Sequence, residues 1–136
     1  MAEGSESVIA VDTNILVRYV TNDDPLQARR ALAILARQED IFIPKTVLLE
    51  TEWVLRAVYE LPVESILKAL LHILGLPNVV AENPEEVSLA LDYYSRRLDF
   101  ADALHLASSC HADSFFSFDA AFVKRGKKIG ARVEKG

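Results

Sequence analysis

The sequence predicts an α/β protein in which helices cover both faces of a parallel β-sheet. Short apolar runs, which are typical of strands, alternate with longer segments of helical periodicity along the whole chain. Proline, glycine and small polar residues separate these segments. A strand that is followed by a helix and then by another strand is typical of parallel pairing, so helices are expected on both faces of the sheet.

Each predicted strand is a short apolar run bounded by turn or capping residues. The first has four consecutive apolar residues without alternation, as expected for a strand buried on both faces of a sheet. The third is the weakest, and the fourth is rich in phenylalanine. The predicted strands are residues 8–11, 41–43, 79–81, 114–118 and 132–134.

The predicted helices have apolar residues at helical spacing and recognisable start or stop signals. Pro25, Pro62 and Pro84 fit the first turns of three of them, where the missing N–H is tolerated. Gly75 is placed to end the helix that begins near Pro62. The predicted helices are residues 14–20, 26–37, 46–59, 62–74, 84–97, 99–111 and 121–127.

Length and composition predict one folded domain. A chain of 136 residues with 51% apolar content can bury a single core but hardly two. Residues 1–7 are small and polar without periodicity, so we expect a disordered lead followed by one domain over residues 8–136. No apolar run approaches the roughly 20 residues needed to cross a bilayer, and no segment resembles a signal peptide.

The single cysteine, Cys110, excludes an internal disulfide and fits a reducing compartment. We therefore expect a cytoplasmic protein. Cys110 lies in a segment of apolar helical pattern, which predicts a buried thiol that packs as a small hydrophobe.

The net charge of −5 argues against a protein that is held on nucleic acid mainly by a global positive field. The local charge differs, because the chain from residue 120 onward carries six basic residues and only one acid, Glu134. A solvated amphipathic terminus would explain this pattern equally well. The basic residues are Lys124, Arg125, Lys127, Lys128, Arg132 and Lys135.

Four acidic residues lie where an apolar segment ends or where an apolar helix face is interrupted. A carboxylate in such a place is costly unless something compensates it, and a divalent cation shared by all four would do so. Sites made of carboxylates select hard cations such as Mg²⁺ or Mn²⁺, which enzymes use to bind phosphate oxygens and to generate hydroxide. The sequence therefore predicts a metal-dependent enzyme with Asp12, Glu50, Asp102 and Asp119 at its site.

Three of these positions could instead belong to helix caps. Asp12 and Asp119 each follow a predicted strand and precede a helix, so either could be a helix N-cap. Asp99 and Asp102 could form a cap and its acidic partner at the third helical position. The same arrangement would leave both carboxylates at the start of the helix. His105 lies one turn further among apolar residues, and we expect it to be a packed histidine rather than a ligand.

Glu50 shares a helical stripe with Val47, Val54 and Val58, so we expect it to point where these valines point. Glu52 lies roughly opposite, four residues before Arg56, as in a surface ion pair. A partly exposed Glu50 that is favoured by the helix dipole is the alternative.

Four segments of the chain resemble the PIN-domain nucleases, and among these the VapC-like toxins of prokaryotic toxin-antitoxin pairs. They contain Asp12 with Asn14, then Glu50, then Asp99 with Asp102, and finally Ser117 with Asp119. They occur in the order of the family, and the resemblance covers nearly everything from residue 8 to residue 133. The segments are residues 11–19, 46–56, 99–107 and 116–119.

The resemblance implies a three-layer α/β/α fold with a central parallel sheet. It also implies that Asp12, Glu50, Asp102 and Asp119 are catalytic and bind the metal, with Asp99 assisting. Asn14 and Ser117 would help to position the site, and Ser117 stands where many relatives have threonine, which keeps the hydroxyl. Similar proteins are endoribonucleases that use Mg²⁺ or Mn²⁺, form homodimers and are silenced by a small antitoxin protein.

Three other functions remain open from the sequence. A PIN-type nuclease in RNA processing would have the same motifs as a toxin. A Mg²⁺-dependent phosphatase or a receiver-like domain would use Asp12 as phosphoryl acceptor, although Asn14 stands where the phosphatase pattern has a second acid. A non-catalytic protein-binding module would use the same acids to attract a basic partner.

Overall fold

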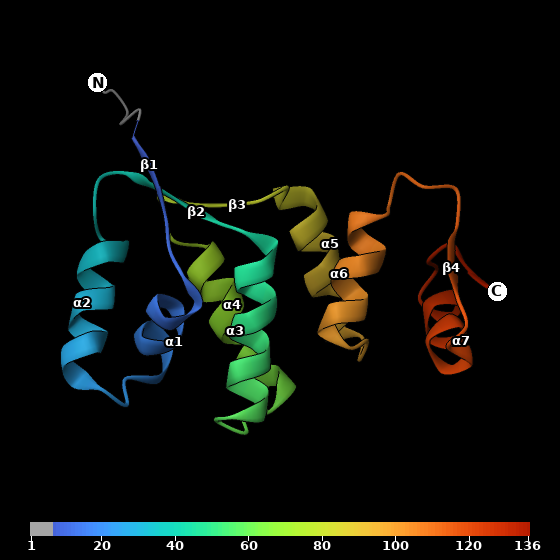
Figure 1. Cartoon of the computed structure of the whole chain (residues 1–136), viewed down its shortest axis with the longest axis horizontal. Coiled ribbons are helices and arrows are strands. Elements are labelled where there is room, and N and C mark those ends of the chain that lie inside the picture. The colour runs from blue at the N-terminus through green and yellow to red at the C-terminus, as the bar shows by residue number, and fades with distance from the viewer. Residues whose placement is uncertain (1–6) are drawn as a thin grey trace. The chain divides into compact units, whose positions relative to one another are not determined.

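A computed structural model describes residues 7–136 of the chain, which divides into two compact units, residues 1–82 and 83–136 (Figure 1). Each unit is an α/β structure with its own parallel sheet. Except for Ser7, the predicted disordered lead lies outside the described residues.

The first unit has a three-stranded parallel sheet with strand order β1-β2-β3. Ile41 in the central strand β2 is in register with Ile9 of β1 and with Val79 of β3. Each crossover between neighbouring strands contains a pair of helices, as expected for parallel pairing. The elements are β1 (Val8–Ala10), α1 (Thr13–Thr21), α2 (Pro25–Leu35), β2 (Asp40–Ile43), α3 (Lys45–Ala57), α4 (Val63–Leu74) and β3 (Val79–Ala81).

The prediction that the first strand is buried on both faces is wrong. β1 forms one edge of the three-stranded sheet, and Val8 is 61% exposed. The apolar contacts of the unit instead concentrate on the central strand β2, in which Ile41 and Ile43 are fully buried. Helix side chains complete this core, namely Leu16, Val17, Ala31, Leu35, Leu48, Leu55, Ile66, Leu70 and Ile73.

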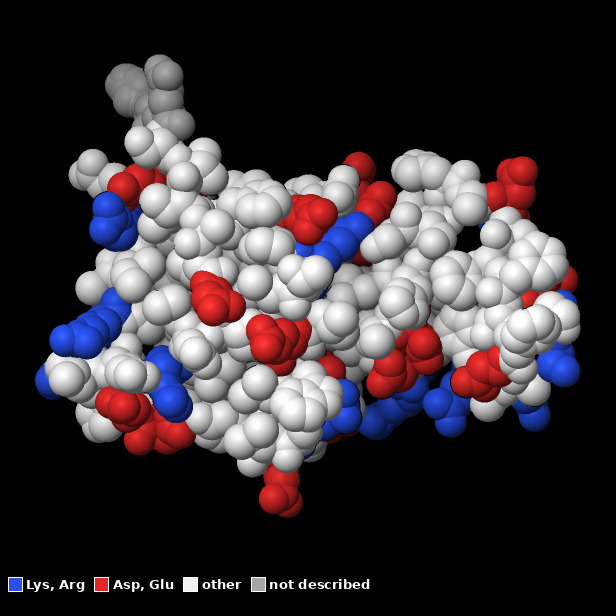
Figure 2. Space-filling view, viewed as in Figure 1, with Lys and Arg blue, Asp and Glu red and all other residues white. Residues whose placement is uncertain are grey.

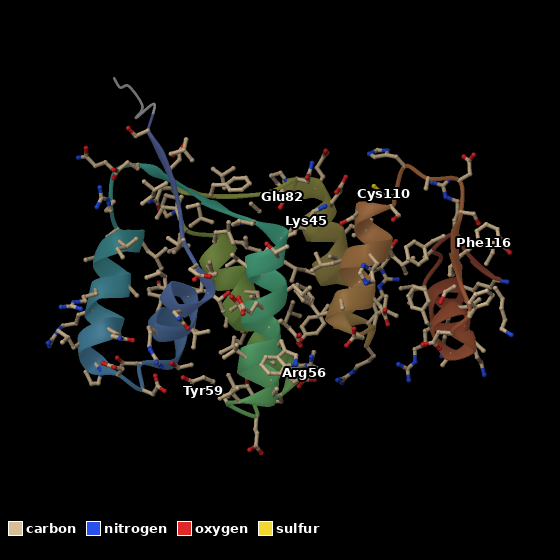
Figure 3. The ribbon with its side chains drawn as sticks, in the orientation of Figure 1. Lys45, Arg56, Tyr59, Glu82, Cys110 and Phe116 are labelled. Carbon is tan, nitrogen blue, oxygen red and sulfur yellow. The ribbon has the colours of Figure 1, made fainter. Side chains whose placement is uncertain are left out.

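The start of α3 is held by a residue distant in sequence. Pro44 at its N-cap position makes no side-chain cap bond. The carboxylate of Glu82, just after β3, accepts a 2.8 Å hydrogen bond from the backbone N–H of Lys45, and Figure 3 shows the two residues side by side. The bond satisfies one of the unpaired N–H groups of the first helical turn and fixes where α3 begins relative to the sheet. Glu50 lies on this helix.

The second unit has two parallel strands, β4 and β5, and three helices. Phe115 of β4 is in register with Val133 of β5, and Ser117 with Lys135. The elements are α5 (Pro84–Ser95), α6 (Phe100–Ser108), β4 (Phe115–Ser117), α7 (Ala120–Lys128) and β5 (Val133–Lys135).

Close packing fixes these elements relative to one another. The buried ring of Phe100 meets Tyr94 edge to face, with 5.0 Å between the ring centroids, and this contact joins α6 to α5. Gly126 lets α7 approach β5, because an added Cβ would lie 2.6 Å from Cγ1 of Val133. These contacts set the positions of the first turns of α6 and α7, where the predicted acids lie.

The predicted helices and strands are confirmed with small shifts at their ends. The largest difference is at α6, which ends at Ser108 rather than continuing to residue 111, so Cys110 and His111 lie in the turn that follows. None of the helices in the described part of the chain has the length and apolar character needed to cross a membrane.

Candidate metal centre

Asp12 follows β1 and caps α1. Its backbone is extended, and its Oδ1 accepts a 2.7 Å hydrogen bond from the backbone N–H of Thr13. Asp12 is therefore an N-cap, as the structural alternative proposed. The side chain is exposed, and a carboxylate that caps through one oxygen keeps a second oxygen that can accept from other groups or bind a cation. Asn14, the second residue of α1, is also exposed.

Thr13 connects α1 to the predicted site residue on α3. Its hydroxyl donates a short hydrogen bond to Oε1 of Glu50, so one oxygen of that carboxylate is held in place. The sequence analysis did not identify Thr13 as a site residue. A signal was present, because Thr13 lies three and four positions before the buried residues Leu16 and Val17 and therefore shares their helix face. A hydroxyl on a core-facing side needs a partner.

The predicted environments of the two glutamates on α3 are wrong. Glu50 is exposed, and the valine stripe that it shares is not part of the core, since Val58 is 61% exposed. Glu52 is the buried acid of this helix, at 1% exposure. The predicted pair with Arg56 exists, with 2.8 Å between Nε and Oε2, and Arg56 lies towards the end of α3 (Figure 3). Glu52 is thus a structural acid, whereas Glu50 is accessible to a ligand.

Asp99 and Asp102 lie together at the start of α6. Asp99 is the N-cap, and its Oδ2 accepts a 3.3 Å hydrogen bond from the backbone N–H of Asp102. The cap therefore places the two carboxylates at the same end of the helix. Asp99 is exposed and Asp102 is half-buried.

Asp119 caps α7 from the end of β4. Its Oδ1 accepts a 3.1 Å hydrogen bond from the backbone N–H of Phe122. Its own backbone N–H donates to the hydroxyl of Ser117 at 3.0 Å. Ser117 therefore helps to orient the backbone that carries Asp119.

Asp99 and Asp119 act electrostatically on Asp102, and we call these three residues the acidic trio. The pKa of Asp102 is raised above its ordinary value of 3.8, first by partial burial and then by the negative charges of Asp99 and Asp119. The positive charges of His105 and Arg125 oppose the rise. A group of like charges around a half-buried carboxylate is unfavourable unless cations are nearby.

The expectation of a packed His105 is wrong. The side chain is exposed, and one face of its ring stacks on Phe115 at a centroid distance of 6.4 Å. The other predicted burial, that of the Cys110 thiol, is also wrong, because Cys110 is only half-buried. His105 is close enough to Asp102 to lower its pKa, so it belongs to the electrostatic environment of the acidic trio.

Basic residues line a cavity of about 390 Å³ in the second unit, which we call the basic cavity. Arg97 on its wall has a left-handed backbone (φ 78°), which is common for the residue just after the end of a helix, here α5. Arg125 both lines the cavity and acts on the pKa of Asp102, so the cavity adjoins the acidic trio. The wall consists of Arg96, Arg97, Leu98, Arg125, Lys128 and Ile129.

The face of the molecule that Figure 2 shows has no broad region of one charge. Figure 2 shows acidic and basic side chains interspersed over the visible face of the molecule.

The predicted site residues form two groups in the structure. Asp12 and Glu50 are linked through Thr13 in the first unit, and in the second unit Asp99 and Asp119 are close enough to Asp102 to affect its pKa. Both groups consist of exposed or half-buried carboxylates, which are the donors that Mg²⁺ and Mn²⁺ prefer. The donor set therefore fits a hard divalent cation.

Comparison with protein families defines the class of this α/β chain. Asp12 and Asp119 follow parallel strands and begin helices, and residues 9–128 match the family model of the PIN domain. PIN domains are generally nucleases and usually use divalent metal ions. The chain belongs to the PIN-domain family, and the predicted α/β/α fold class with a central parallel sheet is confirmed. Comparison with curated proteins gave no match.

Proposed function

We propose that the chain is an endoribonuclease that hydrolyses RNA phosphodiester bonds with Mg²⁺ or Mn²⁺. The observation that carries the proposal is the acidic trio in a chain whose residues 9–128 match the PIN domain. The negative charges of Asp99 and Asp119 help to raise the pKa of Asp102, and a divalent cation would relieve that repulsion. RNA cleavage that requires Mn²⁺ or Mg²⁺ and stops in EDTA is the direct test.

In this proposal Asp12, Glu50, Asp102 and Asp119 hold the cation, and Asp99 assists. A bound Mg²⁺ or Mn²⁺ would supply a Lewis acid for phosphate oxygens and would lower the pKa of water. Thr13 keeps the carboxylate of Glu50 in one orientation, and Ser117 does the same for the backbone of Asp119. Asn14 helps to position the site. No side chain becomes covalently attached to the substrate.

The basic cavity is suited to hold the RNA backbone beside the acidic trio. Phosphate contacts by Arg and Lys supply most of the sequence-independent affinity for nucleic acids. Arg18, a basic residue of the first unit, pairs with Asp23 at 3.0 Å and donates to Gln27 and Tyr59. Arg96 on the cavity wall pairs with Asp92 at 3.3 Å. We therefore assign backbone binding first to Arg125 and Lys128 of the cavity.

Replacing Lys128 in the basic cavity by Gln is expected to weaken RNA binding. Loss of one phosphate contact should reduce the slope of log affinity against log salt concentration by about 0.7 for single-stranded RNA. Lys124 is on the same helix but not on the cavity wall, so Lys124→Gln should leave the slope unchanged. Fluorescence anisotropy over a salt series measures both. Equal losses in the two variants would mean that the general charge of α7, and not the cavity, binds RNA.

We also propose that the protein is the toxin of a toxin-antitoxin pair, that it forms a homodimer in the cytoplasm, and that a small antitoxin silences it. Exposed apolar side chains on α3 and α4 of the first unit support the partner proposal. Trp53 is 53% exposed, and Val58 and Leu71 are similarly accessible. Apolar surface of this kind is typical of interfaces. A small open reading frame that abuts the gene would support the toxin role over RNA processing.

Light scattering at micromolar concentration should give the mass of a dimer. Trp53→Ser should lower that mass, because it replaces an apolar side chain of the proposed interface by a polar one. Phe118 is also a highly exposed aromatic residue, but it lies in the second unit. Phe118→Ser is therefore the matched control and should leave the mass unchanged. A strict monomer that copurifies with no small protein from its native operon would contradict both partner proposals.

A further inference from the structure

Three side chains of the second unit place their metal-binding atoms close together, away from the acidic trio. A carboxylate oxygen of Glu86, the thiol sulfur of Cys110 and a ring nitrogen of His111 all lie within 4.8 Å of one another. Glu86 is in the first turn of α5, and the other two residues are in the turn that follows α6. We call these residues the mixed cluster.

Backbone hydrogen bonds hold the turn that carries Cys110 and His111. The N–H of Cys110 donates to the carbonyl of Ala107 at 3.2 Å, and the N–H of Ala112 donates to Ser109 at 2.9 Å. Nη2 of Arg132 donates to the carbonyl of Cys110 at 2.9 Å. These bonds fix the backbone that carries Cys110. Figure 3 shows this residue at the end of α6.

The chemistry of the donors selects a different kind of ion from the acidic trio. One thiolate, one imidazole and one carboxylate suit Zn²⁺ and similar transition ions, whereas Mg²⁺ prefers oxygen donors alone. Tetrahedral Zn²⁺ with bonds of about 2.0–2.3 Å keeps its donor atoms roughly 3.3–3.8 Å apart. The donor atoms of the mixed cluster lie within 4.8 Å of one another, so side-chain rotations that move them by about 1 Å would bring them to that spacing.

We propose that Glu86, Cys110 and His111 form a binding site for Zn²⁺ or a similar transition-metal ion. Three protein ligands leave one coordination position open for water or a small ligand. Cys110 also lines a cavity of about 200 Å³.

The site has two structural consequences. An ion bound there ties the first turn of α5 to the segment after α6, so it stabilises this pair of helices. It is also separate from the proposed nuclease centre, because Asp102 is in the first turn of α6 and Cys110 follows its last residue, Ser108, roughly 9 Å further along the helix axis. Zinc binding and RNA cleavage can therefore be tested independently.

Cobalt is the probe of choice because Cys110 is the only cysteine of the chain. Titration of the full-length protein with Co²⁺ should produce a thiolate-to-cobalt charge-transfer absorption band, and Zn²⁺ should then remove the band by displacing Co²⁺. Excess Mg²⁺ should leave the band in place. Absence of the band in the wild-type protein would overturn the proposal without the need for any variant.

Substitutions test each ligand. Cys110→Ser should abolish the band, and Glu86→Gln and His111→Gln should each weaken Zn²⁺ binding by about tenfold or more. His72→Gln, in the first unit, is the control and should bind Zn²⁺ like the wild type. Wild-type Zn²⁺ affinity in any of the three ligand variants would overturn the three-residue site. Circular dichroism would verify that each variant is folded.

Discussion

Replacing Asp102 by Asn is expected to reduce RNA cleavage by roughly 100-fold or more, because even partners that only orient a metal ligand are worth 10–100-fold. Asn has nearly the same shape but lacks the negative charge that a divalent cation needs. The fold should remain intact, since Asp102 contributes its backbone N–H, and not its carboxylate, to the cap of α6. Cleavage of a labelled RNA in Mn²⁺, with circular dichroism as the folding check, measures the effect.

Asp113→Asn is the matched control for this experiment. Asp113 is an exposed acid in the same unit and lies beyond the end of α6, so the substitution makes the same chemical change away from the acidic trio. It should leave cleavage unchanged. An equal loss of activity in Asp113→Asn would indicate that the net charge of the unit is responsible, and not a metal site.

Asp12→Asn should also abolish cleavage, although Asp12 belongs to the first unit. Asn is as good an N-cap as Asp, so the bond to the N–H of Thr13 and the start of α1 should be kept. A purified Asp12→Asn protein that cuts RNA as fast as the wild type would point to a contaminating nuclease, and the proposed function would then be rejected.

The sequence was sufficient to predict the elements because their ends carry local signals. Pro25 and Pro84 occupy the first turns of α2 and α5, and Asp12, Asp99 and Asp119 begin three other helices. Capping depends on residues that are close in sequence, so it can be predicted from the sequence alone. Capping and metal binding are compatible roles for a carboxylate, which is why the two interpretations of these acids could not be separated by pattern.

The environment of the acids on α3 could not be predicted in the same way. The helix has apolar residues on more than one face, and the leucines Leu48 and Leu55, rather than the valines, face the core. Glu52 shares that buried face. An acid followed by Arg56 four positions later has the pattern of a surface pair, so nothing local distinguishes it from a buried one. Burial is decided by tertiary packing, and so is the exposure of His105.

A second large effect is expected in thermal unfolding. Free Mn²⁺ at about 100 times its dissociation constant should stabilise the wild type by roughly 2.7 kcal/mol relative to EDTA, if the unfolded chain does not bind it. For a domain of this size the melting temperature rises by several degrees. The scans are best made in a Cys110→Ser background, so that metal binding at the mixed cluster does not contribute.

Without metal, neutralising one of the proposed metal-binding acids should not lower the melting temperature. The pKa of Asp102 is higher in the folded chain than its ordinary value of 3.8. The carboxyl therefore stabilises the folded chain at pH values below 3.8. This contribution is lost as the pH rises through the raised pKa. At neutral pH the ionised acidic trio therefore destabilises the folded chain, and neutralising one member relieves repulsion. Asp119→Asn, which can keep the cap bond to Phe122, should melt no lower than the wild type in EDTA.

Comparison of Asn with Ala at residue 119 separates charge from capping. Asp119→Ala removes both the charge and the cap, and should lose about 1 kcal/mol relative to Asp119→Asn. Asp12→Asn should behave like Asp119→Asn, and both should gain less from Mn²⁺ than the wild type, because each removes a carboxylate from the proposed shared site. Equal shifts with Mn²⁺ in the wild type and both Asn variants would refute a shared metal site, as would Asn variants that unfold well below the wild type in EDTA.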